Sequence, residues 1–126
     1  MRLVRAWKLW LSEHLARAQR ADLALGAFPC GGHTTTGGML LAGVPVLTYA
    51  GETFASRVAG SALHVAGLPE LVTTSLEEYE ALAVALARDP QRLAALRARL
   101  QANRNTALFF DMRRLALDLE ALYEAM

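Results

Sequence analysis

The chain contains 126 residues, which is enough for one domain with a buried core. Hydrophobic residues make up 54% of it and charged residues 20%, a composition that excludes an intrinsically disordered protein. The formal net charge is +1, so the chain lacks the excess of basic residues with which proteins bind nucleic acids or anionic membranes. No apolar run approaches the roughly 20 residues of a membrane-spanning helix.

Two further features of the composition narrow the class of protein. Ala and Leu supply 47 of the 126 residues and Ile is absent, which favours helices. Cys30 is the sole cysteine, which excludes an internal disulfide or a cysteine-cluster metal site and is typical of a reducing compartment. Residues 1–11 have a basic start and an apolar centre, but Lys8 interrupts the apolar stretch and no small-residue cleavage site follows. We therefore expect a cytoplasmic protein.

In chain order, the first part of the sequence predicts helices that alternate with short buried strands. Ser12 caps the first predicted helix, Pro29 ends the first strand, and Gly43 ends the second helix. The predicted elements are a helix over residues 11–20, a strand over 23–28, a helix over 34–42, a strand over 44–49, a helix over 51–66 and a strand over 71–74. A strand, a helix and a strand within about 30 residues are typical of a parallel βαβ unit.

The rest of the chain predicts helices only. Ser75 and Glu78 form a capping box, in which the acidic residue follows the cap by three positions, and it opens a helix over 75–88. Further amphipathic helices are predicted over 90–103 and 111–126. We expect a single partial domain over residues 1–126, in which residues 1–74 form an α/β unit and residues 75–126 form helices packed on it.

The most informative segment is the glycine-rich turn that leads into the second helix. A helix N-terminus exposes backbone N–H groups and favours anions through the helix dipole. Hydroxyl groups and an imidazole add further donors here, so the turn predicts a phosphate or diphosphate site, with these candidate residues: Gly32, His33, Thr34, Thr35 and Thr36. A second interpretation stays open, in which the glycines and threonines make only a tight turn and a helix cap.

The other candidate residues favour structural interpretations. His14, on a short polar helix, is typical of a surface histidine, and His64 is more typical of a structural position in a helix than of a ligand. The spacing of the histidines matches no metal-binding motif. Cys30 has no activating base beside it in the sequence. Glu52 and Arg57 follow the second strand, and either of them could line a cleft there. Alternatively, the charge of Glu52 could merely stabilise the N-terminus of the next helix.

An ordered series of short motifs runs over essentially the whole chain: Glu13–Arg17, Ala21–Leu23, Gly32–Thr35, Ala42–Val46, Gly51–Ala59, Gly67–Leu71 and Glu78–Tyr79. This series resembles the C-terminal, donor-binding part of the O-linked N-acetylglucosamine transferase (SPINDLY-like) family, especially its bacterial members with tetratricopeptide repeats. The number and order of the motifs make this resemblance far more specific than the glycine turn alone.

The resemblance implies a glycosyltransferase of the two-lobed GT-B fold that moves a sugar from UDP-N-acetylglucosamine (UDP-GlcNAc) to protein Ser or Thr, without a metal ion or other cofactor. This chain would be a partial, Rossmann-like C-terminal lobe with about three parallel strands and flanking helices. By position, His14 would pack against the uracil, while His33, Thr34 and Thr35 would hold the diphosphate. The helix N-terminus would then stabilise the diphosphate leaving group in place of a metal ion.

One departure from the family concerns the donor ribose. Gly38 stands where the family usually carries an Asp that bonds a ribose hydroxyl. A glycine cannot accept this hydrogen bond, whose loss costs about 1.5–3 kcal/mol, or roughly ten- to hundredfold in affinity. We therefore expect weaker donor binding than the family norm.

A larger departure is that the family's acceptor-side lobe, which carries its catalytic histidine, has no counterpart in these 126 residues. We expect the chain to supply one wall of the cleft, with no catalytic residue of its own and with no transferase activity alone. Its expected partners are UDP or a UDP-sugar and the missing lobe or another chain, but not nucleic acid or a membrane. One alternative is a non-catalytic protein-interaction module, in which Trp7 and Trp10 would contact the partner. Another is a truncated remnant without activity.

Overall fold

Three parallel strands form the centre of the molecule, in the order β1–β2–β3. The computed structural model describes residues 4–126. Ala24 pairs with Val46 between the first two strands, and Thr48 pairs with Val72 between the second and third. The strands are β1 (Ala24–Leu25), β2 (Val46–Tyr49) and β3 (Val72–Thr73). This sheet confirms the predicted parallel α/β fold.

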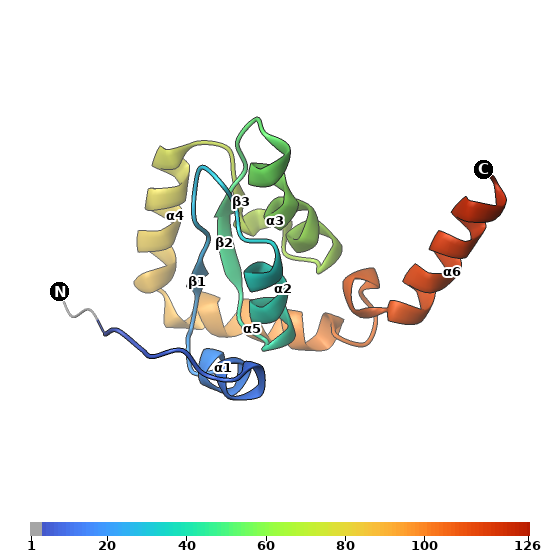
Figure 1. Ribbon diagram of the computed structural model, residues 1–126. Coiled ribbons are helices and arrows are strands. Elements are labelled where there is room, and N and C mark those ends of the chain that lie inside the picture. Colours follow the sequence, from blue (N-terminus) through green and yellow to red (C-terminus); the bar gives the residue numbers. More distant parts are fainter. Residues whose placement is uncertain (1–3) are drawn as a thin grey trace.

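Helices cover both sides of the sheet (Figure 1). The α-helices are α1 (Leu11–Ala18), α2 (Thr34–Leu41), α3 (Phe54–Val65), α4 (Leu76–Ala87), α5 (Pro90–Asn103) and α6 (Met112–Glu124), and the 3-10 helices are η1 (Pro69–Leu71) and η2 (Leu108–Phe110). In Figure 1, α2 and α3 lie on one side of the sheet, α4 lies on the other, and α5 crosses below. Among residues 4–126, no helix is both long enough and apolar enough to cross a membrane.

The core forms around β2, which is almost completely buried. Its residues from Val46 to Thr48 expose at most 2% of their surface, because the strand is paired on both edges and covered on both faces. Such burial explains the continuous apolar run, since parallel strands inside a helix-covered sheet do not alternate with polar residues. Leucines from the surrounding elements complete the core: Leu40, Leu63, Leu68, Leu71, Leu86, Leu96 and Leu100.

The predicted element ends are observed with small shifts. Gly43 and Gly67 follow α2 and α3 with φ angles of 78° and 82°, in the left-handed region that favours glycine. The first helix begins before the predicted cap Ser12, because the Glu13 carboxylate accepts a hydrogen bond from the Trp10 backbone N–H at 3.4 Å.

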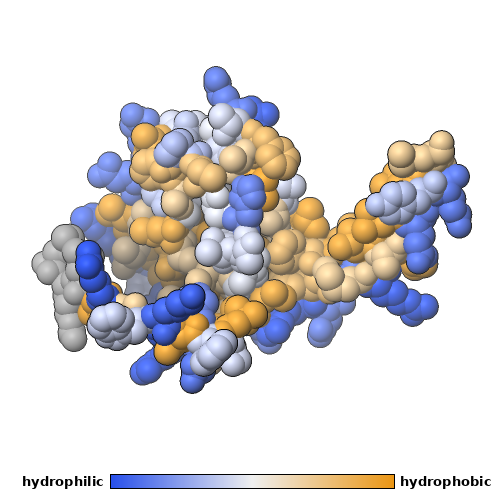
Figure 2. Space-filling view, in the orientation of Figure 1, coloured by the Kyte–Doolittle hydropathy of each residue, from blue (hydrophilic) through white to orange (hydrophobic). Residues whose placement is uncertain are grey.

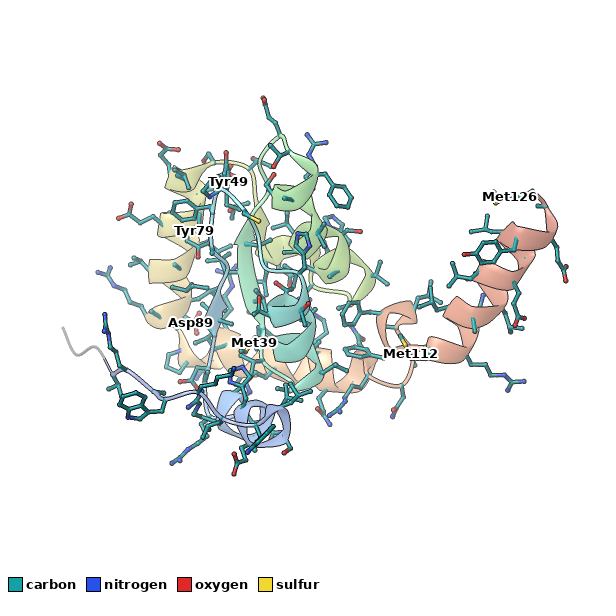
Figure 3. The ribbon with its side chains drawn as sticks, in the orientation of Figure 1. Met39, Tyr49, Tyr79, Asp89, Met112 and Met126 are labelled. Carbon is teal, nitrogen blue, oxygen red and sulfur yellow. The ribbon has the colours of Figure 1, made fainter. Side chains whose placement is uncertain are left out.

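Strand β1 is shorter than the run of apolar residues that predicted it. The chain leaves the sheet after Gly26, and Phe28 packs edge-on against Tyr49 and Tyr79, with ring centroids 6.3 and 5.8 Å away. The Tyr79 hydroxyl donates a hydrogen bond to the Gly26 carbonyl at 2.9 Å, and burial raises the pKa of this phenol. In Figure 3, Tyr79 extends from α4 toward the end of β1. These contacts fix the point from which the glycine-rich turn departs.

Helix α4 begins with a hydrogen-bonded cap. The Ser75 hydroxyl accepts from the Glu78 backbone N–H at 3.1 Å, as the capping box predicts. The Glu78 carboxylate accepts from both the backbone N–H and the hydroxyl of Thr74, each at 3.0 Å. These bonds lower the pKa of Glu78 below its ordinary value, the backbone bond contributing most.

Helix α6 differs from the expectation that all helices after residue 75 pack on the α/β unit. Helices α4 and α5 do so, but α6 projects away from the body (Figure 1), and every one of its residues is exposed. The amphipathic pattern predicted the helix correctly, yet such a pattern does not specify which surface covers the apolar side.

We expect Glu78→Gln to lower the free energy of unfolding at neutral pH, because the charged carboxylate is the stronger acceptor for the Thr74 donors. A lowered pKa means that this stabilisation is present above the unfolded-state pKa and is lost as the pH falls through the folded-state pKa. Urea unfolding at several pH values should therefore show a deficit at pH 7 that shrinks toward pH 3. Glu80→Gln, on the same helix, is the control; an equal, pH-independent deficit in both variants would contradict the assignment.

Candidate functional site

The N-terminus of α2 lies beyond the carboxyl end of β1, the edge at which parallel α/β sheets bind ligands. The first helical hydrogen bond joins the Gly37 N–H to the His33 carbonyl at 3.0 Å, so the three preceding N–H groups have no partner inside the helix. His33 occupies the N-cap position without a side-chain cap bond, and the first turn contains no acidic residue. This turn therefore presents several donors and no negative charge.

Four other helices of the described chain begin differently. In each of them a side chain accepts a hydrogen bond from the first helical turn, and the capping residues are Thr53 for α3, Ser75 for α4, Asp89 for α5 and Asp111 for α6. Each cap satisfies one backbone N–H of its first turn, whereas no side chain caps the first turn of α2.

Gly32 allows the turn to approach the threonine run closely. A Cβ atom at this position would lie 2.5 Å from the Thr35 hydroxyl and 2.9 Å from the Thr36 hydroxyl. Only glycine fits such a distance without moving those hydroxyls. Thr36 is buried, whereas Thr34 and Thr35 are exposed, so the exposed hydroxyls join the open backbone donors on the surface.

The His33 side chain bridges the turn to α3. Its Nε2 lies 3.2 Å from the Ala55 carbonyl oxygen. Because a carbonyl only accepts, Nε2 carries the proton and Nδ1 is left as the nitrogen that a ligand would meet. The ring also packs edge-on against Phe54, with centroids 6.4 Å apart.

The side chain of His14, on α1, is oriented by an arginine of the same helix. The Arg17 guanidinium lies 3.2 Å from Nδ1 of His14 and donates a second bond, at 2.9 Å, to the Trp7 carbonyl. A guanidinium has only donors, so Nδ1 of His14 accepts, and the neutral ring carries its proton on Nε2. The imidazole is half-buried with a defined tautomer and orientation.

Helix α1 carries His14 to the side of α2. Leu15 packs over Gly38, where a Cβ would lie at an ordinary contact distance of 3.5 Å from the leucine Cδ2. Arg97 of α5 holds the segment after α1 by donating to the carbonyls of Gln19 and Ala21, at 2.9 and 2.7 Å. Gly38 follows Thr34 by about one helical turn, roughly 6 Å of helix axis. Helix α1 thus packs on the side of α2, and the glycine-rich turn leads into the N-terminus of the same helix. His14 and His33 do not contact each other directly.

The remaining candidates lie outside this cluster. His64 bonds its own helix through the Gly60 carbonyl at 2.9 Å, and Glu52 is exposed. The Arg57 side chain bonds the Gly51 carbonyl at 2.9 Å. Cys30 is exposed beside the turn. Within residues 4–126, no three His, Cys, Asp or Glu side chains gather as a metal-binding group.

Two contributors to the site were missed in the sequence. Arg17 follows His14 by three residues on a helix, so their spacing alone places them on one face. The Ala55 carbonyl offers no comparable signal, because it is a backbone group 22 residues from His33 and reaches it only through the packing of α3.

Comparison with known proteins identifies the class of this molecule. It has the fold of part of a GT-B glycosyltransferase: a mutant O-GlcNAc transferase from Thermobaculum terrenum, a solved structure, superposes with a TM-score of 0.82 at 36% identity and covers 89% of this chain. The family described as glycosyl transferase family 41 matches residues 6–119. The chain belongs to glycosyl transferase family 41.

Curated relatives share the same region. The UDP-N-acetylglucosamine–peptide N-acetylglucosaminyltransferase of Caenorhabditis elegans is 40% identical over 90% of this chain, and the probable enzyme SEC of Arabidopsis thaliana is 44% identical over 91%. A probable SPINDLY enzyme of Petunia hybrida is 34% identical over 90%. The chain spans about a tenth of the length of these relatives, 10–12%, and 22% of the Thermobaculum terrenum chain.

The contacts of Gly32 predict an asymmetric pair of glycine substitutions. Gly32→Ala should lower the free energy of unfolding by about 1–3 kcal/mol, because its methyl group must displace the hydroxyls of Thr35 and Thr36. Gly37→Ala should instead raise it by up to about 1 kcal/mol, because its Cβ meets only Phe109 at 3.9 Å and alanine is the better helix former. Chemical denaturation of both variants checks the prediction, and equal effects in the two would contradict the geometry.

Proposed function

We propose that this chain forms the donor-binding wall of a protein O-GlcNAc transferase. In this proposal the open N-terminus of α2 holds the diphosphate of UDP-GlcNAc, and α1 holds the uracil beside it. The observation that carries the proposal is the uncapped first turn of α2 at the carboxyl end of β1, in a chain that belongs to glycosyl transferase family 41.

The diphosphate would be bound by dipoles and hydrogen bonds. Backbone N–H groups at a helix N-terminus favour anions, and the exposed hydroxyls of Thr34 and Thr35 add neutral donors. No metal ion enters this proposal, because the helix N-terminus supplies the positive potential that the leaving UDP requires.

His33 would donate to the diphosphate only through a protonated Nδ1. Its Nε2 proton already serves the Ala55 carbonyl, so a neutral ring would turn only the lone pair of Nδ1 toward the phosphate. Protonation of Nδ1 converts this lone pair into a donor and adds a positive charge, without breaking the Ala55 bond. Hydrogen bonds to charged groups of this kind contribute about 1.5–3 kcal/mol each.

His14 would pack against the uracil. Arg17 fixes the ring orientation in advance, so little conformational freedom remains to be lost when the base binds. This role rests on the family position of His14 and on its place beside α2.

The chain alone would bind the donor without transferring the sugar. Transfer requires donor and acceptor to be held together in one closed cleft. The site described above contains donors for a leaving diphosphate but no group placed to activate an acceptor hydroxyl. In the family the catalytic histidine is expected in the acceptor-side lobe, so the remaining lobe would have to come from the rest of a longer protein or from another chain.

A second candidate function is a non-catalytic interaction module. It is favoured by Trp7 and Trp10, whose side chains are 90% and 83% exposed, since large exposed aromatic residues are typical of protein-binding surfaces. A chain with this function would not respond to UDP.

Titration with UDP tests the donor site. In ¹H–¹⁵N NMR spectra of the folded chain, UDP should shift the amide signals of residues 32–36 and of α1. Inorganic diphosphate should shift only the signals of residues 32–36. His33→Gln should weaken UDP binding about ten- to hundredfold, because it removes a charged donor. His64→Gln, on α3, should leave the affinity unchanged. A folded chain that shows no shift at millimolar UDP would overturn the proposal and favour the interaction module.

Gly38 offers a gain-of-function test. Gly38→Asp restores a carboxylate that can accept a hydrogen bond from the ribose. It should tighten the binding of UDP about ten- to hundredfold and leave the binding of inorganic diphosphate no tighter. A Cβ at this position meets only Leu15 outside the backbone of the helix, at an ordinary contact distance of 3.5 Å. Gly38→Ala is the matched control, which should stabilise α2 by about 1 kcal/mol without changing UDP affinity. Equal calorimetric affinities for both variants would argue against a ribose at this position.

A further inference from the structure

Helix α1 is attached to the body by little apolar packing. Of its eight residues, only Ala18 is buried. Small side chains surround it, Ala42 and Val44, with Leu15 and Met39 partly buried beside them. In Figure 2, hydrophilic side chains are interspersed with hydrophobic ones over α1, at the lower edge of the view. Because a helix of this length is not stable on its own in water, its position depends on specific contacts with the body.

Helix α1 runs along α2 in the same direction. Leu15 lies over Gly38, in the middle of α2. Gln19, just after α1, lies near Gly43, just after α2, and both line a cavity of about 550 Å³. The part of α1 that carries His14 is therefore nearer the glycine-rich turn than its C-terminus is. The space beside Gln19 is open, so apolar packing does not fix the far end of α1.

A guanidinium from α5 holds this far end instead. The Arg97 side chain donates to the carbonyls of Gln19 and Ala21, at 2.9 and 2.7 Å, and lies 3.9 Å from the Asp22 carboxylate. Carbonyl groups at a helix C-terminus lack partners inside the helix, and the helix dipole favours a cation there. The rigid fork of a guanidinium binds both carbonyls at once, which fixes the direction in which the chain leaves α1.

We propose that Arg97 is a positioning residue for the uridine part of the donor. It holds α1 at the place on α2 where His14 meets the uracil, without touching the donor itself. This role rests on the proposed function, in which α2 binds the diphosphate and α1 binds the uracil. The turn at the start of α2 is held separately, by the bond between His33 and the Ala55 carbonyl. Arg97 therefore contributes to the preference for a uridine nucleotide over a bare diphosphate.

The ratio of the affinities for UDP and for inorganic diphosphate isolates this role. Partial unfolding weakens the binding of both ligands by the same factor, since only the folded fraction binds. Loss of a distant positive charge also weakens both alike, because the two ligands carry about the same negative charge at neutral pH. A displaced α1 weakens only the binding of UDP. The ratio thus responds to positioning and not to a merely structural effect.

Calorimetric titration of the folded chain with each ligand tests the proposal. Arg97→Ala should weaken UDP binding about tenfold, as expected for one lost bond to a charged group, and leave diphosphate binding unchanged. Arg97→Lys keeps the charge but not the fork, so it should weaken UDP binding by a smaller factor. Arg99→Ala is the matched control: it removes the same side chain two residues further along α5, where the guanidinium pairs with Glu70. Both affinities should be unchanged in this control.

NMR spectra of the same variants resolve where each ligand acts. In Arg97→Ala, UDP should still shift the amide signals of residues 32–36, while its shifts in α1 shrink. If UDP shifts no α1 amide in the unmodified chain, the proposed function is overturned together with this role. If UDP does shift α1 but the ratio of affinities survives Arg97→Ala, or falls equally in Arg99→Ala, only the positioning role is overturned. Should Arg97→Ala not fold, the ratio in Arg97→Lys decides, and a value equal to that of the unmodified chain contradicts the role.

Discussion

The pairing of β1 with β2 is the constraint on which the candidate site depends. The ladder bond from the Gly26 N–H to the Leu47 carbonyl, at 2.8 Å, ends β1, and the chain then runs through residues 27–31 into the glycine-rich turn. Because β2 runs parallel to β1, the chain must cross back through a helix, and the N-terminus of that helix lies at the carboxyl edge of the sheet. The open donors of α2 therefore follow from the strand register, because a slip of the pairing would move the turn, and His33 with it, away from the Ala55 carbonyl.

Local signals were sufficient to predict most of the elements. Gly43 and Gly67 mark helix ends whose positive φ angles a residue with a Cβ would resist, and Ser75 marks a helix start through a bond only three residues long. The donors at the start of α2 could be predicted for the same reason, since a helix N-terminus and its neighbouring residues are adjacent in sequence.

What escaped prediction depends on contacts between distant parts of the chain. The orientation of His33 is set by a carbonyl on α3, and the position of α1 is set by Arg97, which reaches carbonyls 76 and 78 residues away. The direction of α6 escaped for a different reason. An amphipathic pattern states that one face avoids water, and in this helix the described chain offers no surface that covers it.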